Sequence, residues 1–227
     1  MQKKVSLVLP VLNEEKNIEE LIFLLKKYLK NFSYEIIFVD DNSSDKTKSL
    51  IKKNISGKIK YFLRKKNKDL TRSCFLGIAN SRYENIIIMD SDLQHNPKYL
   101  PKIINIFFKN KLDFAVAVRN FREDQGLTWI RKYTSLILSF SFNFFLGHKV
   151  SDPMSGFFMF KKSIFYKHKN NLFGKGWKIL ADLIYNKDVF LIKEVQIKFD
   201  KRKKNKSKMN LGVLTNLVKL FLFKQQF

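Results

Sequence analysis

Two carboxylates, one residue apart, follow an apolar run near the middle of the chain. The run covers residues 86–89, and Asp90 and Asp92 come directly after it. The run indicates a buried strand, and charged groups at its end need a cationic partner because an unpaired buried charge is costly. Mg²⁺ and Mn²⁺ prefer oxygen ligands and leave positions open for phosphate oxygens. The pattern predicts a divalent-metal site; the alternative is that the acids cap a helix starting near Pro97.

Polar residues also follow two other predicted strands, at residues 5–9 and 35–39. Asn13 and Glu14 follow the first strand, and Asp40 opens the run DDNSSD after the second. Ligands of open α/β sheets bind at the carboxyl ends of the strands. We therefore expect these clusters to meet Asp90 and Asp92 along one edge of a sheet. Helix capping and a turn are the alternative roles for the acids at 40–45.

The elements that must position these clusters alternate between strands and helices. Strands are predicted at residues 5–9, 35–39, 60–63, 85–89 and 113–118, and helices at 18–29, 44–53, 70–79 and 99–108. Ser44 is expected to cap the second helix. This alternation is typical of an α/β protein with a Rossmann-like, mostly parallel sheet flanked by helices.

The second half of the chain is less regular. The apolar patterns predict a helix at 129–146, a strand at 157–160, a helix at 177–186 and a strand at 190–199. A basic loop at 201–208 then leads to an amphipathic helix at 211–223. We see neither an internal repeat nor a flexible linker, so one domain over residues 1–227 is expected.

The composition narrows the class of protein. A net charge of +24, from 44 basic and 20 acidic residues, predicts attraction to polyanions. Nucleic-acid binding is disfavoured, because most phenylalanines have core spacing and the acids gather at strand ends. Cys74 is the only cysteine, which rules out an intrachain disulfide. The N-terminal apolar run is interrupted by Pro10 and is not expected to be a signal peptide, and no run reaches the ~20 apolar residues of a membrane span.

The motifs, taken in order, resemble family 2 glycosyltransferases with the GT-A fold. The likeness is greatest to the dolichol-phosphate mannosyltransferase group, which transfers sugars to polyprenyl phosphates. The matching stretches are LPVLNEE, VDDNSSDKT, residues 64–77, MDSDLQHNP, VAVR, RKYTS, SDPMSGFF, GWKIL and RKKNKSK. The resemblance implies a nucleotide-sugar-binding half at 1–120 and an acceptor half at 121–227, which ends in a membrane-facing helix.

The resemblance also implies roles for individual residues. The nucleotide-binding residues would be Pro10, Asn13, Glu14, Asp40 and Asp90. Mg²⁺ or Mn²⁺ would be held by Asp90, Asp92 and Gln94, with Asp92 as a direct ligand. Three arginines, Arg119, Arg131 and Arg202, would complete the catalytic set with Asp92, because guanidinium groups match phosphate oxygens. Each arginine has a solvated surface charge as its alternative role.

Further residues are implied to contact the acceptor or the sugar. They are Ser135, Asp152, Ser155, Ser207 and Lys208. The alternatives are a helix N-terminal position for Ser135, and turn chemistry alone for Asp152 and Ser155. His95 is expected to orient a metal ligand rather than to be one.

The chain departs from the family pattern in two places. Asn42 replaces a usual glycine, a mild change because asparagine tolerates positive φ. In the last loop, Asn205 and Lys206 stand where the family often has a glycine and an acid.

The implied reaction transfers a sugar from GDP-mannose or a UDP-hexose to a dolichyl or undecaprenyl phosphate, with inversion. The phosphate nucleophile is already anionic, so the protein mainly aligns the groups and offsets charge on the leaving group. A family 2 enzyme with another acceptor, such as lipopolysaccharide, a glycan or a protein, is the main alternative. A nucleotidyltransferase with a similar sheet would leave SDPMSG and the basic loop without a role.

The lipid acceptor and the charge together predict a peripheral enzyme at the cytoplasmic face of the membrane. Seven basic residues in 198–208 would face anionic lipid, and the helix at 211–223 offers an apolar face to the interface. Packing of that helix on the sheet is the alternative. Many relatives carry transmembrane helices after this domain, whereas this sequence stops at Phe227. Membrane contact is therefore expected through the protein's own surface or through a membrane partner subunit.

Overall fold

The computed structural model describes residues 2–65, 68–119, 150–176, 179–185, 188–198 and 200. Several predicted features lie outside the described residues. They are the helices at 129–146 and 211–223, the basic loop at 201–208, and Arg131, Ser135, Arg202, Ser207 and Lys208.

Within the described residues, seven strands form the central sheet, in the order β3-β2-β1-β4-β6-β5-β7. The strands are β1 (Lys4–Val11), β2 (Ser33–Asp40), β3 (Ile59–Leu63), β4 (Asn85–Met89), β5 (Phe114–Arg119), β6 (Phe157–Lys161) and β7 (Ile192–Ile197). β6 pairs antiparallel with β4 and β5, and the other pairings are parallel. The predicted mostly parallel α/β sheet is confirmed.

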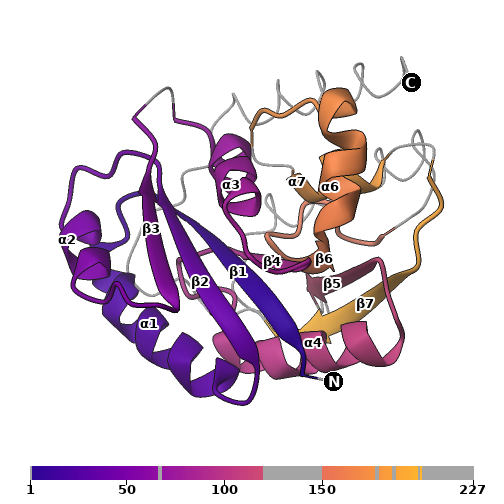
Figure 1. Ribbon diagram of the computed structural model, residues 1–227, viewed down its shortest axis with the longest axis horizontal. Coiled ribbons are helices and arrows are strands. Elements are labelled where there is room, and N and C mark those ends of the chain that lie inside the picture. The colour runs from indigo at the N-terminus through magenta and orange to yellow at the C-terminus, as the bar shows by residue number, and fades with distance from the viewer. Residues whose placement is uncertain are drawn as a thin grey trace, which may run out of the picture.

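Helices cover both faces of this sheet (Figure 1). They are α1 (Glu15–Leu29), α2 (Thr47–Lys52), α3 (Leu70–Ala79), the 3₁₀ helix η1 (Pro97–Tyr99), α4 (Leu100–Lys109), α6 (Lys162–His168), the 3₁₀ helix η2 (Lys169–Asn171) and α7 (Ile179–Ile184). α1 and α4 lie on one face, and α3, α6 and α7 lie on the other (Figure 1).

Alternation along the strands builds one hydrophobic core on each face. In β1, Leu7 and Leu9 pack with Ile18 of α1, whereas Val8 packs with Ile78 of α3. Successive side chains of a strand point to opposite faces, so a strand buried on both faces is apolar throughout. This explains why the central strands appear in the sequence as continuous apolar runs.

Most predicted elements agree with the structure. The helix at 70–79 and the strand at 85–89 have the predicted bounds. The prediction that Ser44 caps α2 was wrong. Lys46 precedes the helix, Asp45 Oδ1 accepts the N–H of Thr47 at 3.0 Å, and the N–H of Ser44 donates to Asn13. The strand predicted at 190–199 is shorter, and α6 was not predicted because about two turns are too few to show a helical period.

The antiparallel direction of β6 places the start of this strand beside the end of β4. The carboxyl ends of β1, β2 and β4 lie at one edge of the sheet, and β6 begins at that edge instead of ending there. The turn before β6 therefore meets the residues after β4: the N–H of Asp90 donates to the carbonyl of Gly156 at 3.2 Å.

Candidate functional site

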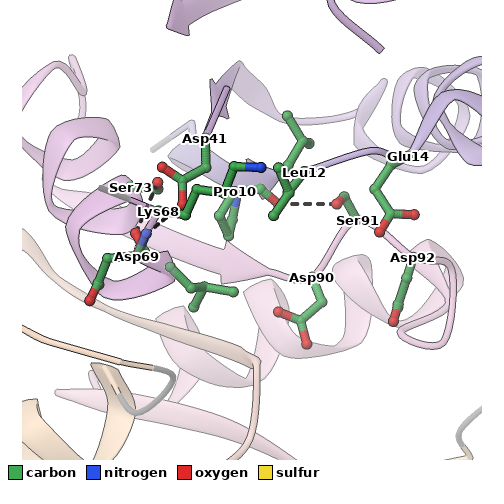
Figure 2. A pocket seen from close by; sticks show the side chains of 12 residues that line it. Pro10, Leu12, Glu14, Asp41, Lys68, Asp69, Ser73, Asp90, Ser91 and Asp92 are labelled. Atoms are coloured by element: carbon green, nitrogen blue, oxygen red, sulfur yellow. Dashed lines mark hydrogen bonds between the residues drawn. The ribbon is translucent and has the colours of Figure 1, made fainter. Parts of the chain in front are cut away.

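A cavity of about 120 Å³ opens at the carboxyl ends of β1, β2 and β4. Its lining residues are Pro10, Val11, Leu12, Glu14, Asp41, Lys68, Asp69, Leu70, Ser73, Asp90, Ser91 and Asp92. In Figure 2, Asp41, Lys68, Asp69 and Ser73 gather at one end, and Glu14, Asp90 and Asp92 lie at the other. The structure thus brings four of the residues predicted from the sequence, Pro10, Glu14, Asp90 and Asp92, to one cavity.

The partly exposed Asp90 side chain contacts the turn before β6 and the loop after β4. A Cβ atom at Gly156 would lie 2.2 Å from Asp90 Oδ2, so the carboxylate occupies the space that the missing side chain leaves. His95, which is 3% exposed, places Nδ1 3.5 Å from the same oxygen. Its ring packs against Phe157 with 5.6 Å between the centroids. His95 thus lies behind Asp90, where a group that orients the carboxylate would be found.

Asp92 belongs to an irregular loop between β4 and η1. Its Oδ1 accepts the N–H of Gln94 at 3.1 Å, and Ser91 Oγ donates to the carbonyl of Pro10 at 3.0 Å. Leu93, between Asp92 and Gln94, has a φ of 63°, in the left-handed region. The carboxylates of Asp90 and Asp92 point to the same side of the strand end (Figure 2).

The donor set of this loop fits a hard divalent cation. In the part of the chain that the structure describes, no group of three or more His, Cys, Asp or Glu side chains converges to hold a metal ion. Mg²⁺, however, is commonly held by one or two carboxylates together with water and substrate phosphates. The two carboxylates of Asp90 and Asp92 at the cavity match that open arrangement.

Asp40, which the sequence suggested as a nucleotide-binding residue, is not among the residues that line the cavity. Its Oδ1 accepts the N–H and the hydroxyl of Ser43 at 2.8 and 2.6 Å, and its Oδ2 accepts the hydroxyl of Tyr61 at 2.9 Å. Burial, and after it Asp40, raises the pKa of Tyr61 well above its usual range. These bonds are the turn contacts that were the alternative role for Asp40, and its contact with a nucleotide stays a prediction.

Asp41 is the acid of β2's end that faces the cavity, and sequence reasoning missed it. Arg64 donates to Asp41 Oδ1 through Nε at 2.8 Å and Nη2 at 2.7 Å, and the N–H of Asp69 donates to Oδ2 at 2.6 Å. Burial raises the pKa of the Asp41 carboxyl above its usual range, although Arg64 acts in the opposite direction. The alternation of side chains along β2 could have identified Asp41. Asp41 lies two positions after Val39, so its side chain points to the same face as Val39, the face that α3 covers.

The N-terminal end of α3 completes this side of the cavity. Asp69 accepts the N–H of Arg72 at 3.0 Å and the N–H of Gly176 at 2.9 Å, so it joins the helix to the 174–176 turn. Ser73 lies one turn further along the helix, and its hydroxyl is 3.2 Å from Arg64 Nε. The exposed Lys68 places a cation at the rim, where it suits an anionic ligand.

Asn13 and Glu14 connect β1 to the turn after β2. Asn13 has a φ of 53°, and its side chain accepts the N–H of Ser44 at 2.8 Å. Glu14 is 5% exposed and accepts from Asn17 Nδ2 at 2.7 Å. Asn42 has a φ of 66°, as expected for a residue that replaces glycine.

The turn before β6 is built by its own polar residues. Asp152 Oδ1 accepts the N–H of Met154 at 3.1 Å, and Ser155 Oγ donates to the carbonyl of Ala117 in β5 at 2.6 Å. These bonds are the turn contacts that were the alternative for both residues, and their contact with the acceptor or the sugar stays a prediction. Arg119 is the last residue of β5.

The chain is similar to several known proteins. The model of glycosyl transferase family 2 matches residues 6–169. A dolichol-phosphate mannosyltransferase of Pyrococcus furiosus is 31% identical over 91% of this chain, and one of Mycosarcoma maydis is 27% identical over 96%. The chain spans 59% of the length of the first relative and 79% of the second.

Solved structures show the same fold at lower identity. Glucosyl-3-phosphoglycerate synthase from Mycobacterium tuberculosis, in complex with Mn²⁺, UDP-glucose and phosphoglyceric acid, matches with a TM-score of 0.74 and 16% identity. The match covers 99% of this chain and 80% of the synthase. This likeness supports the predicted GT-A-like sheet. The match of the family model to most of the chain shows that the chain belongs to glycosyl transferase family 2.

Proposed function

We propose that the chain is an inverting glycosyltransferase that moves a sugar from a nucleotide sugar to a polyprenyl phosphate. One observation carries the proposal: Asp41, Asp90 and Asp92 line a single cavity at the carboxyl ends of the strands. That is the expected place for a ligand in an open α/β sheet. The similarity to two dolichol-phosphate mannosyltransferases supports the polyprenyl phosphate acceptor.

The two ends of the cavity suit the two ends of a nucleoside diphosphate. Asp41, held by Arg64, offers acceptors to the N–H groups of a base or to the hydroxyls of a ribose. Pro10, Glu14 and Asp90 would line the path between, and Asn13 and Asp40 would support it through the turns that they hold. A base at the Asp41 end places the diphosphate at the Asp92 end, beside the proposed metal ligands.

Asp90, Asp92 and Gln94 would hold Mg²⁺ or Mn²⁺ at the diphosphate. Such an ion supplies positive charge that offsets the negative charge of the leaving nucleoside diphosphate. Arg119, Arg131 and Arg202 would add guanidinium donors to the diphosphate or to the acceptor phosphate. The Mn²⁺ complexes of the fold relatives from M. tuberculosis support a divalent ion in this fold.

The acceptor phosphate oxygen would attack the anomeric carbon as the bond to the diphosphate breaks. Because this oxygen is anionic, the chain needs no strong base and contributes alignment and charge. Ser135, Asp152, Ser155, Ser207 and Lys208 are proposed to line the acceptor side, in the half of the chain that covers 121–227. Residues 1–120 would bind the nucleotide sugar.

A lipid acceptor places the reaction at a membrane surface, proposed to be the cytoplasmic face. Among the helices that the structure describes, none has the length and apolar character of a membrane span. The basic residues of 198–208 would bind anionic lipid, with a membrane partner subunit as the alternative route.

Product analysis tests this function. The purified chain is incubated with GDP-mannose, UDP-glucose or UDP-N-acetylglucosamine, Mn²⁺, and dolichyl or undecaprenyl phosphate, and the lipid is analysed by mass spectrometry. We expect a lipid-linked hexose from one donor, absent in the Asp92→Asn variant. A sugar found only on a soluble acceptor, such as 3-phosphoglycerate in a parallel incubation, would contradict the polyprenyl phosphate assignment.

A further inference from the structure

Two residues that follow β7, Lys198 and Asp200, contact the segment that begins with Asp92 and Gln94. The N–H of Asp200 donates to the carbonyl of Gln94 at 3.1 Å, and Asp200 Oδ2 accepts from Asn96 Nδ2 at 2.7 Å. Two residues earlier, the N–H of Lys198 donates to the hydroxyl of Tyr99 at 3.2 Å. These bonds join residues that lie about a hundred positions apart, 104 in the case of Asn96 and Asp200.

The loop needs such support because its backbone is strained. Leu93 has a φ of 63°, a region that L residues other than Asn, Asp and His seldom adopt. Strain of this kind persists where the surroundings impose it, most often at functional sites. The Leu93 side chain is buried in the core on the α1 face, so it cannot turn outward to relieve the strain.

The supports of the loop come from both of its sides. Before Leu93, the hydroxyl of Ser91 is bonded to the carbonyl of Pro10 in β1. After Leu93, the carbonyl of Gln94 is bonded to Asp200. The hydrogen bond from Asp200 therefore orients the peptide plane that follows Gln94. Because the direction of a side chain depends on its backbone, this bond also influences where the Gln94 side chain points.

We propose that Asn96 and Asp200 form a clamp that positions Gln94 and Asp92 to hold a divalent ion. The two residues act through the loop, and we assign them no contact with the ion or the nucleotide. The inference rests on the proposed function, because it takes the metal and the nucleoside diphosphate as the ligands of this loop. Groups that orient metal ligands contribute strongly to metal affinity.

The geometry of Asn96 allows the clamp to be inverted. Its Oδ1 accepts the N–H of Lys98 at 3.0 Å and so caps η1, which leaves Nδ2 for Asp200. In the Asn96→Asp variant the cap acceptor remains, but two carboxylates meet where the bond was. Combining Asn96→Asp with Asp200→Asn restores one donor and one acceptor, with the roles exchanged.

The test measures binding of GDP and UDP to the full chain by calorimetry, with Mn²⁺ and with EDTA. We expect Asn96→Asp and Asp200→Ala to weaken the Mn²⁺-dependent affinity by about tenfold or more. The double variant should recover most of this loss. Binding in EDTA should not change, because the clamp acts on metal ligands. Asn105→Asp, an identical change on the exposed face of α4, should bind like the parent protein.

Each other outcome overturns the inference. Equal Mn²⁺-dependent affinity in the parent and in Asn96→Asp would show that the clamp has no effect on the loop's ligands. Equal losses with Mn²⁺ and with EDTA, or no recovery in the double variant, would show a structural role only. A parent protein that binds neither nucleotide with Mn²⁺ would overturn the proposed function, and the clamp with it.

Discussion

At the scale of single residues, the position of a carboxylate decides its role. Asp40 and Asp41 are neighbours in the chain, yet Asp40 is bonded to Ser43 and Tyr61, whereas Asp41 lines the cavity. Consecutive residues of an extended chain point to opposite sides, so only one acid of such a pair can face a given cavity. Asp90 and Asp92, two positions apart, lie on the same side and can act together.

Asp92 should be essential for metal-dependent binding. Asp92→Asn removes one charge but preserves the shape of the side chain, so we expect the folded protein to lose most of its transferase activity and its Mn²⁺-dependent nucleotide affinity. EDTA should have the same effect on the parent protein. Glu19→Gln, on the exposed side of α1, makes the same charge change away from the cavity and serves as the control. Full activity of Asp92→Asn would exclude the metal role.

Asp41 should matter more than Asp40 for the nucleotide. A hydrogen bond to a charged group contributes about 1.5–3 kcal/mol, so Asp41→Asn should weaken binding of the preferred nucleotide by about tenfold or more. Asp40→Asn should have the smaller effect, because its contacts are within the turn. Calorimetry on both variants decides between them. A larger loss in Asp40→Asn would favour the assignment made from the sequence.

At the scale of elements, the turn before β6 limits the space around Asp90 at one end of the cavity. β6 is antiparallel, so Gly156 at its start lies against the carboxylate of Asp90. The glycine is required here for space, since any Cβ would collide with that carboxylate. Gly156, which has no side chain, therefore leaves the space that the Asp90 carboxylate occupies. The position of Asp90 depends on this glycine.

Gly156→Ala tests this contact. The added Cβ would lie 2.2 Å from Asp90 Oδ2, so the carboxylate must move. We expect a folded protein with reduced Mn²⁺-dependent nucleotide affinity. Gly57→Ala is the matched control, because a Cβ there meets nothing within 4 Å. If both variants bind like the parent protein, Asp90 does not have to hold its position.

A buried charge also joins the strands at the opposite edge of the sheet. Burial acts to raise the pKa of Glu35, but Lys60, Ser6 and the N–H of Arg82 together lower it below its usual range. Lys60 Nζ lies 2.7 Å from Glu35 Oε2, and Ser6 Oγ lies 2.6 Å from Oε1. The group connects β1, β2 and β3 away from the cavity.

Glu35→Gln should lower stability in a way that depends on pH. Because the folded-state pKa is lowered, the ionised carboxylate stabilises the fold above the ordinary value of about 4.5, and this contribution is lost as the pH falls below it. We expect a loss of about 2 kcal/mol at pH 7, and a smaller difference from the parent protein near pH 3. Urea unfolding at both pH values measures it. A constant difference would show that the carboxylate is not ionised in the fold.

At the scale of the whole molecule, the net charge of +24 predicts attraction to anionic surfaces. Such a charge attracts anionic surfaces over a range set by the Debye length, about 10 Å at 0.1 M salt. Acids gather at the cavity, where a divalent ion would balance them. The excess of basic residues would then direct the protein towards the anionic membrane that we propose carries the acceptor.

Vesicle sedimentation tests whether the basic residues bind the protein to anionic membranes. Binding of the full chain should increase with the fraction of anionic lipid and decrease with salt, since each basic residue near the surface contributes on the order of 1 kcal/mol. Removal of the residues after Lys208 should weaken binding if the predicted apolar face at 211–223 enters the interface. Equal binding to neutral and anionic vesicles, or none to either, would favour a membrane partner subunit.

The sequence by itself determined most of the elements and the edge of the sheet at which the polar clusters meet. Apolar runs and helical spacing predicted the strands from β1 to β5 and the helices between them, because these patterns reflect burial against one sheet. Parallel strands bring their carboxyl ends to one edge, so the polar clusters after β1, β2 and β4 had to meet. Asp90 and Asp92 could therefore be placed at a site without coordinates.

Only the tertiary structure decided which side chains enter that site and what holds them. Asp41 points to the same face of the sheet as Val39, and only the structure shows that α3 covers this face beside the cavity. Gly156 reaches Asp90 because β6 is inserted antiparallel between β4 and β5. Asp200 reaches Asn96 from 104 residues away. Local sequence reports burial and period, but contacts such as these depend on strand order and direction, which are set by the packing of the whole sheet.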